Sequence, residues 1–167
     1  MVHVETLFAQ LSRRVYNVAC WHTRDAAAAD DIVSTVFEKV IRGLPRFDPS
    51  RASAEDWVFA VAMNALRDHA RAARRNRTVS VESVAELTAA GRSPEDTVVD
   101  SDRLARLLEG VAKLRPRDRE VLTLRLAGGL SNEAVARLCR LRKGHVAVIV
   151  HRAVRELRVM LAAQEGP

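Results

Sequence analysis

The sequence contains few aromatic residues, few glycines and only two cysteines. These shortages bear on its fold class and argue against some kinds of site. Aromatic residues make up 4% of the 167 positions against 48% hydrophobic residues overall, so Ala, Val and Leu supply most of the apolar mass. Such residues, with few glycines, predict an all-helical protein. Cys20 and Cys139 lie far apart without CxxC spacing, which argues against a disulfide framework or a zinc site. Because no second pair of ligands accompanies Cys20 and His22, we expect a buried thiol beside a packed histidine.

Targeting and catalytic motifs are missing as well. The chain has no basic-then-apolar leader and no uninterrupted apolar run of about 18 residues, so we expect a cytoplasmic protein without membrane insertion. No Gly-rich phosphate loop, HExxH motif or Ser-His-Asp order stands out. Asp30 and Asp31 are adjacent and point to different sides of a helix, which makes a poor catalytic carboxylate pair. We predict no enzyme, no cofactor and no metal.

Positive charge is what the sequence has in excess. The formal net charge is +6 and the pI is ≈ 10.3, which predicts a polyanionic partner such as nucleic acid. Residues 1–75 are close to balanced at +2, residues 76–102 carry −4, and residues 103–167 carry +8. The acidic stretch contains Gly, Ser and Pro and lacks a long helical stripe. We therefore predict basic modules at 1–76 and 103–167, joined by a flexible acidic linker at 77–102.

Apolar periodicity predicts three packed helices in the first module. A stripe at steps of three and four indicates an amphipathic helix that begins near Asp25 and ends before Pro45. The Pro, Ser and Asp residues of the segment 46–55 predict a loop there. A second stripe predicts a helix over 56–75, and an earlier helix runs over 5–22. The expected fold of this module is a small bundle of three to four helices.

The second module has the pattern of a helix-turn-helix. Pro116 suits the first turn of a helix and Asp118 suits its positive end. Gly128–Gly129 ends that helix, and Ser131 is suited to cap the next, short one. A longer helix over His145–Ala162 completes the pattern.

One face of the helix over 56–75 is the first candidate for binding nucleic acid. At 100° per residue, its arginines gather within about one third of the circumference, more than solubility requires. Arginine binds phosphate in bidentate fashion, whereas Asn and Asp can contact bases. A solvated helix face is the alternative that the residues leave open. The residues of this face are Asn64, Arg67, Asp68, Arg71, Arg74 and Arg75.

The loop before that helix and the start of the last helix are two further candidates. The loop can receive an unstacked base, with Phe47 or Trp57 as a stacking surface, although Trp57 is also suited to the core. The last helix would enter a major groove, where cations hold phosphates and Val148 can touch a thymine methyl group. The residues within reach are Arg142, Lys143, His145, Ala147, Val148, Arg152 and Arg155.

Three segments together resemble the sigma-70 family of bacterial RNA polymerase sigma factors. DAAAADDIVSTVFEKVIRGLPRFDP resembles the core-binding part of region 2, and WVFAVAMNALRDHARAARR resembles the adjoining helix that melts and reads the minus-ten element. LRPRDREVLTLRLAGGLSNEAVARLCRLRKGHVAVIVHRAVRELR resembles region 4, which reads the minus-thirty-five element. Their order and the short length resemble the extracytoplasmic-function (ECF) group.

The resemblance implies partners and roles. Region 2 would bind the clamp helices of the largest subunit of core RNA polymerase, region 4 would bind the flap of the second-largest subunit, and both would bind promoter DNA. The loop, including Ser50 and Arg51, would cradle a flipped base beside Phe47 and Trp57. The linker would run toward the active centre, and an anti-sigma factor is a possible further partner. The implied polymerase-binding residues are Asp30, Asp31, Ser34, Thr35, Phe37 and Glu38.

The sequence shows three departures from the family pattern, and two alternative functions are open. Ser34-Thr35 replaces a common Gln-Glu, and Arg142 replaces the usual Ser that caps the recognition helix. Ala147-Val148-Ile149 replaces a frequent Lys-Ser-Arg, which puts direct reading of the minus-thirty-five element in doubt. The second module alone also resembles response-regulator output domains, so a helix-turn-helix regulator that does not bind polymerase is the alternative. A nucleic-acid hydrolase is the third interpretation.

Overall fold

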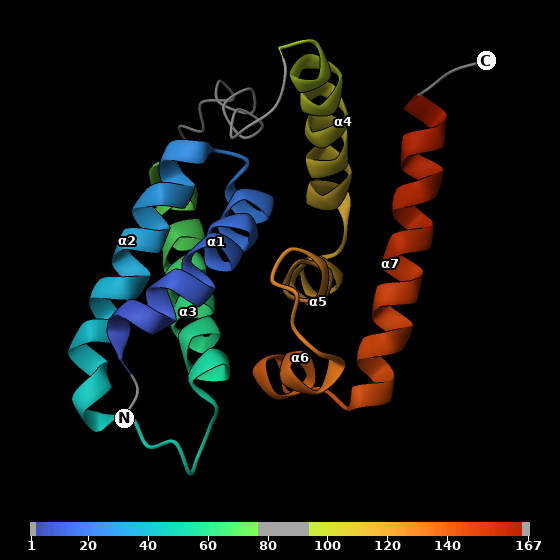
Figure 1. Cartoon of the computed structure of the whole chain (residues 1–167). Helices are drawn as coiled ribbons and strands as arrows, with labels where there is room; N and C mark the ends of the chain where they lie inside the picture. Colours follow the sequence, from blue (N-terminus) through green and yellow to red (C-terminus); the bar gives the residue numbers. More distant parts are fainter. Residues whose placement is uncertain (1–2, 77–93, 165–167) are drawn as a thin grey trace.

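The computed structural model describes residues 3–76 and 94–164, and within these ranges the chain is helical throughout (Figure 1). The first domain contains α1 (Val4–Thr23), α2 (Ala26–Gly43), a short 3-10 turn (Leu44–Arg46) and α3 (Ala54–Asn76). The second contains α4 (Pro94–Lys113), α5 (Pro116–Leu126), α6 (Asn132–Cys139) and α7 (Lys143–Gln164). No helix in the described ranges is both long and apolar enough to span a bilayer. The all-helical prediction and the two small domains are confirmed.

Local signals explain where the helices of the first domain begin and end. Arg24 adopts a left-handed conformation (φ 57°), and its N–H donates to the Cys20 carbonyl at 2.8 Å, which closes α1. The Asp25 carboxylate accepts from the N–H of Ala28 at 3.1 Å and caps α2. The apolar stripes of α1, α2 and α3 meet in a core that includes Val18, Val36 and Phe59.

The second domain has the predicted helix-turn-helix. Gly129 takes φ 64° in the turn after α5, and the Ser131 hydroxyl accepts from the N–H of Ala134 at 3.2 Å as the cap of α6. The chain then turns at Arg140, also left-handed, into α7. α7 packs along α4, α5 and α6, so its buried stripe, which includes Val146 and Ala153, anchors the domain.

Two helices begin earlier in the chain than predicted. α4 begins at Pro94, whose fixed φ suits a first helical turn, and so extends into the stretch 77–102 that was predicted as a linker. The rest of the predicted linker, residues 77–93, lies outside the described residues. The last helix begins at Lys143 rather than His145, because the backbone bonds from His145 and Val146 to the Arg142 carbonyl already close its first turn.

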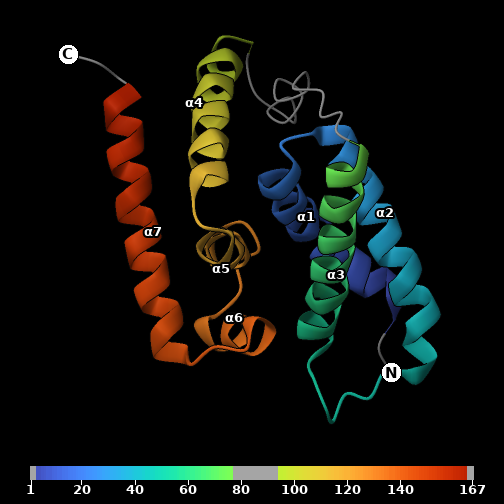
Figure 2. The same cartoon turned by 180° about the vertical axis from the view of Figure 1, so that it is seen from behind.

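The two domains pack against each other, which the sequence did not predict. In Figures 1 and 2, α5 and α6 face α1 and α3, and contacts between α1 and α5 and between α3 and α6 support this view. One apolar cluster is continuous across the boundary, with Val18 and Phe59 from the first domain and Leu124 and Leu130 from the second. The turn at Gly128 lies deepest: a Cβ there would be 3.1 Å from Val18 and 3.3 Å from Phe59. The structure is therefore a closed arrangement of the two domains.

Candidate nucleic-acid interface

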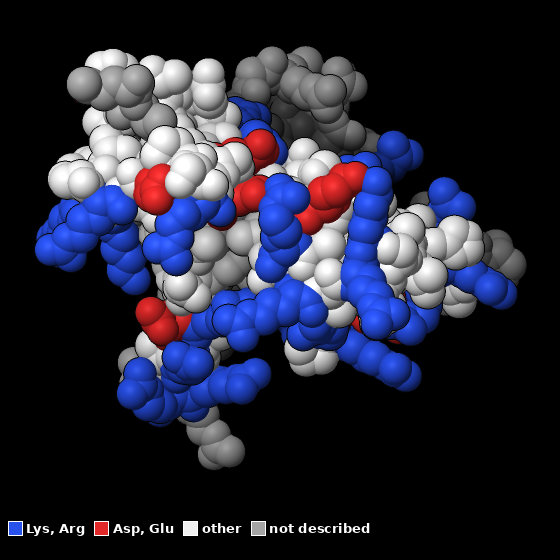
Figure 3. All heavy atoms as spheres, turned by 90° about the horizontal axis from the view of Figure 1, so that it is seen from below, with Lys and Arg blue, Asp and Glu red and all other residues white. Residues whose placement is uncertain are grey.

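The predicted arginine face of α3 lies on the surface. Asn64, Arg67, Asp68, Arg71, Arg74 and Arg75 are all exposed, while Ala62, Met63, Ala65 and Leu66 fill the core. The separation follows from the helical period, since residues three and four apart share a side. Lys and Arg also gather on the face of the molecule seen from below in Figure 3, with fewer Asp and Glu between them. This surface suits phosphate.

The loop before α3 is held by hydrogen bonds and by one ring pair. The Asp48 carboxylate accepts from the Ser50 N–H at 2.9 Å and from its hydroxyl at 2.7 Å, which lowers the pKa of Asp48. The Ser53 hydroxyl accepts from the N–H of Asp56 at 3.0 Å in the first turn of α3. Phe47 stacks on Trp57 with centroids 4.7 Å apart, so the two predicted stacking rings already cover one face of each other.

The start of α7 presents the predicted recognition residues to solvent. Arg142, Lys143, His145 and Ala147 are exposed, and 59% of Val148 is accessible although it is a large apolar residue. Lys143 forms an ion pair with Glu133 of α6, which lowers the pKa of that carboxyl group through a hydrogen bond. The exposed Val148 is thus available for an apolar contact.

Arg152, one of the predicted phosphate-binding residues, is already engaged within its own domain. Its Nη2 donates to both carboxylate oxygens of Asp118 at 2.7 Å, and Asp118 is only 3% exposed. A buried carboxylate requires such a partner, because the charge would otherwise lack both water and protein donors. Arg155, one turn further along, is exposed.

The exposed side of α2 carries the predicted polymerase-binding residues, with one correction. Asp30, Asp31, Ser34, Thr35 and Glu38 are exposed, and Glu38 pairs with Arg42 across one turn at 3.6 Å. Phe37 was expected to face the clamp, but it is only 5% exposed. It belongs to the core stripe of α2 and makes an edge-on contact with Phe8 at 4.8 Å. That part of the prediction was wrong.

Ion pairs between the domains engage the α3 side of this interface. Arg67 of α3 pairs with Glu120 of α5. Asp56, at the start of α3, accepts from Arg137 of α6, with Nη2 at 2.6 Å and Nε at 2.8 Å. The closed arrangement therefore brings the second domain against a helix that was predicted to read DNA.

Arg14 of α1 makes three contacts, one of which crosses the boundary between the domains. Its Nε donates to the Gly128 carbonyl at 2.7 Å, it pairs with Glu55, and its guanidinium lies 5.3 Å from the centroid of Phe59. Sequence reasoning missed Arg14, Glu55 and Glu120. No sequence signal distinguishes them from ordinary surface charges.

The sulfur and imidazole groups do not form a reactive centre. Burial raises the pKa of Cys20 and of Cys139 to about 11, so both thiols stay protonated near neutrality. No cluster of three or more His, Cys, Asp or Glu side chains suited to a metal occurs among the described residues. Burial lowers the pKa of His22 to about 4, with smaller contributions from Arg119 and Arg67.

Comparison with known proteins agrees with this geometry. The family profile for sigma-70 region 2 matches residues 7–76, and that for sigma-70, region 4 matches residues 104–157. The chain is 31% identical over 155 residues to the ECF RNA polymerase sigma factor BldN of Streptomyces coelicolor, covering 93% of this chain but 59% of BldN. It is also 31% identical over 163 residues to the RNA polymerase sigma factor CarQ of Myxococcus xanthus, covering 96% of this chain and 90% of CarQ.

A solved structure shares the fold. The sigma factor RpoE of Bartonella quintana, crystallised with the anti-sigma factor NepR, superposes with a TM-score of 0.71 at 22% identity, covering 95% of this chain and 96% of that one. The sequence matches extend over both domains in the order region 2, region 4. The chain therefore belongs to the sigma-70 family of RNA polymerase sigma factors, in its extracytoplasmic-function group.

Proposed function

We propose that this chain directs core RNA polymerase to promoters, with region 2 binding the clamp and the minus-ten element and region 4 binding the flap and the minus-thirty-five element. The observation that carries the proposal is the match to both regions in order, each with an exposed basic surface. A helix-turn-helix regulator without polymerase is not favoured, because the first domain matches sigma region 2. The chain would act in the cytoplasm, where polymerase is found, and would catalyse no reaction itself.

Region 2 would supply most of the strand-opening contacts. The exposed acidic and hydroxyl residues of α2 suit a basic partner surface on polymerase, and the exposed arginines of α3 suit the phosphates of the minus-ten element. The loop containing Ser50 and Arg51 lies directly before α3, where a displaced base could stack beside Phe47 and Trp57. Arg74 and Arg75 extend the same face toward the end of α3.

Region 4 would hold DNA mainly through phosphates. Arg142, Lys143 and Arg155 are exposed cations at the start and along the side of α7. Ala147 and Val148 have no hydrogen-bonding side chain for base edges, which leaves the imidazole of His145 as the polar group beside them. An anti-sigma factor is a further proposed partner, because RpoE of Bartonella quintana was crystallised with NepR.

Promoter binding would require the two domains to separate. The two promoter elements are centred about 25 base pairs apart, a distance of roughly 85 Å along B-DNA at 3.4 Å per pair. The closed arrangement holds α3 against α6 instead. We infer that the closed form is the resting form and that polymerase and promoter bind the open one.

In vitro transcription with core polymerase, followed by mapping of start sites, tests the proposal. The chain should redirect initiation to a new set of promoters. The double variant Arg67→Ala, Arg71→Ala should lower promoter opening at least tenfold, with less effect on binding to core. The matched control Arg13→Ala, Arg103→Ala, which removes two exposed arginines elsewhere, should open promoters normally. Failure of the wild type to bind core would contradict the proposal.

A further inference from the structure

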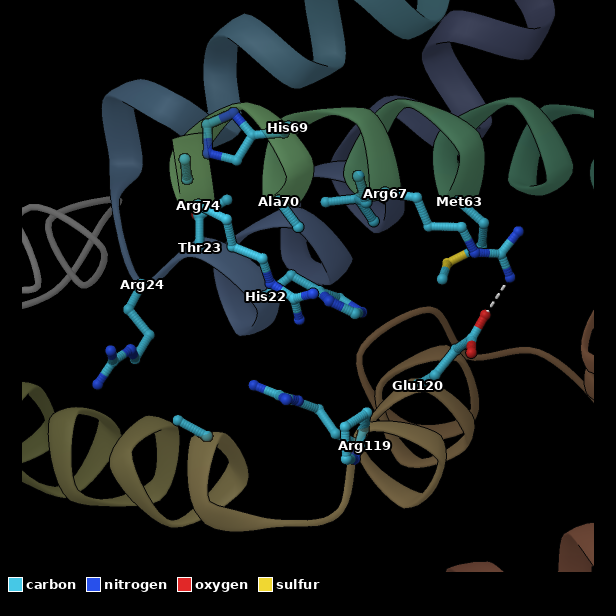
Figure 4. Close-up of a pocket in the computed structure, with 14 residues that line it drawn as sticks. His22, Thr23, Arg24, Met63, Arg67, His69, Ala70, Arg74, Arg119 and Glu120 are labelled. Atoms are coloured by element: carbon cyan, nitrogen blue, oxygen red, sulfur yellow. Dashed lines mark hydrogen bonds and ion pairs between the residues drawn. The ribbon is translucent and has the colours of Figure 1, made fainter. Parts of the chain in front are cut away.

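A cleft of ≈ 390 Å³ lies between the domains, away from the first turn of α7. The end of α1 and the outer part of α3 form one wall, and the end of α4 and the start of α5 form the other (Figure 4). Arg24, Arg67, Arg74 and Arg119 line it, together with His22 and Glu120. The cleft exists only while the domains are closed, because its walls come from both.

Among the described residues, the positive charge of this cleft is poorly compensated. Glu120 is the one carboxylate among the described residues that line it, and it is paired with Arg67. Arg24, Arg74 and Arg119 form no ion pair with any described residue. Burial of Arg119, with Arg24 and Arg74 nearby, lowers the pKa of its guanidinium group. Like charges gathered in a partly buried space repel each other, so an anion bound there would reduce the repulsion between the arginines.

His22 lies on the α1 side of the cleft, among the labelled side chains that border it (Figure 4). Its Nε2 is buried and, within the described residues, has no hydrogen-bond partner. Because this nitrogen is not accessible from the cleft, a ligand there would be held by the arginines and not by His22.

The geometry points to a binding site for a small molecule that carries two or more phosphate groups, held between the two domains by Arg24, Arg74 and Arg119. Guanidinium groups bind phosphate oxygens in bidentate fashion, and three of them without ion-pair partners match a ligand of several negative charges. Met63, Leu66 and Pro116 supply an apolar part of the lining, which suits a phosphorylated compound with a flat or apolar body.

The size of the cleft suits a small ligand. Pockets for small molecules have volumes of about 300–1,000 Å³, and this cleft lies at the lower end of that range. An acidic polypeptide is the alternative occupant, and competition by a peptide tests it.

Occupation of the cleft would favour the closed form. A ligand that touches both walls binds only while they face each other, so it stabilises the arrangement in which Arg67 and Arg74 point toward the second domain. This consequence rests on the proposed function, since α3 matters only if it reads promoter DNA. Binding itself does not depend on it.

Titration calorimetry on the full chain at 0.15 M salt tests the site, with inorganic tripolyphosphate and ATP as probes. At least one probe should bind with a stoichiometry of one. Tighter binding of ATP would indicate a nucleotide, and equal or tighter binding of tripolyphosphate would indicate recognition of the phosphate chain alone. The variant Arg24→Gln, Arg119→Gln, which leaves the predicted DNA-binding residues intact, should lower the affinity at least tenfold.

The control Arg13→Gln, Arg103→Gln removes the same charge, one exposed arginine from each domain, outside the cleft. It should retain the wild-type affinity. Equal weakening in both variants would show general charge attraction and overturn the site, as would the absence of binding by either probe. Competition by a decaglutamate peptide at equal strength would identify an acidic polypeptide as the occupant and likewise overturn it.

Further measurements distinguish loss of the site from loss of folding or of the proposed function. Circular dichroism tests whether each variant folds. The milder variant Arg119→Lys keeps the charge but loses the bidentate geometry, so it should give an intermediate affinity. Transcription without probe should be unchanged in Arg24→Gln, Arg119→Gln. If the wild type transcribes but binds no probe, only this inference fails; if it binds probe but never engages polymerase, only the proposed function fails.

Discussion

The two domains hold their basic side chains in different ways. In region 2, Arg67 is paired with Glu120 of the other domain, so its partner is lost when the domains separate. In region 4, Arg152 is paired with buried Asp118 of its own domain, and separation leaves that pair intact. The domain contact therefore engages Arg67 of α3, whereas Arg152 of α7 is held independently of it. Four substitutions test this difference between the domains.

The largest effect is expected from Arg152→Ala. The substitution leaves the carboxylate of Asp118 buried without its partner, and we expect the free energy of unfolding to fall by about 3 kcal/mol. Urea denaturation measures this free energy of unfolding. Arg155→Ala, an exposed neighbour on the same helix, should change stability by less than about 0.5 kcal/mol. Equal effects of the two variants would show that Asp118 does not depend on Arg152.

Gly128→Ala tests the domain contact directly. The added Cβ would lie 2.7 Å from the Leu124 carbonyl oxygen and 3.1 Å from Val18, so we expect a loss of about 2 kcal/mol and partial opening. Small-angle scattering should give a larger radius of gyration. Gly144→Ala is the matched control, because a Cβ there meets nothing within 4 Å and alanine favours the helix. An unchanged radius in Gly128→Ala would count against the contact.

His22 should make stability depend on pH. Its pKa is about 4 in the folded chain against 6.5 in the unfolded chain, so the unfolded state alone takes up a proton between these values. The free energy of unfolding should therefore fall by about 1–2 kcal/mol as the pH drops from 7 to 5. Comparison with His22→Gln isolates this contribution, and His69→Gln, at an exposed histidine, should retain the wild-type slope. If the free energy of unfolding of the wild type and of His22→Gln varied in parallel with pH, the contribution of His22 would be refuted.

The smallest effect is expected from Arg137→Ala, which removes the ion pair with Asp56 between the domains. Because 60% of the Arg137 side chain is exposed, the loss should be at most about 1 kcal/mol. Screening should remove most of the difference from wild type in 1 M NaCl, whereas the difference for Gly128→Ala should persist. Arg103→Ala is the control, because Arg103 is exposed and has no ion pair among the described residues. A loss at Arg137 that salt does not alter would point to packing instead of charge.

Helical periodicity made most of the local structure predictable. The expected helix over 5–22 is α1 at Val4–Thr23, and the expected cap at Ser131 accepts its hydrogen bond as anticipated. The arginines of α3 and the start of α7 are exposed as expected because the apolar residues between them fix which side is buried. What each exposed residue binds stays a prediction.

The domain contact was unpredictable for a physical reason. Its ion pairs join residues far apart in the sequence, Arg67 with Glu120 and Asp56 with Arg137, and an isolated charge resembles any solvated one. Asp118 was read as a first-turn acid, but packing of α7 against α5 buries it. Phe37 lies one residue after Val36 in the same apolar stripe, so its burial could have been read from the sequence.

The turn at Gly128 has a consequence for the concentrations at which the protein works. The packing of this turn against Val18 and Phe59 favours the closed arrangement, so a partner that needs α3 uncovered, as proposed for promoter DNA, would bind only the open fraction. Its apparent dissociation constant equals the intrinsic one divided by that open fraction. Every 1.4 kcal/mol in favour of closure would thus raise the concentration needed for half-saturation about tenfold, so the packing of this turn would contribute to a threshold for the response.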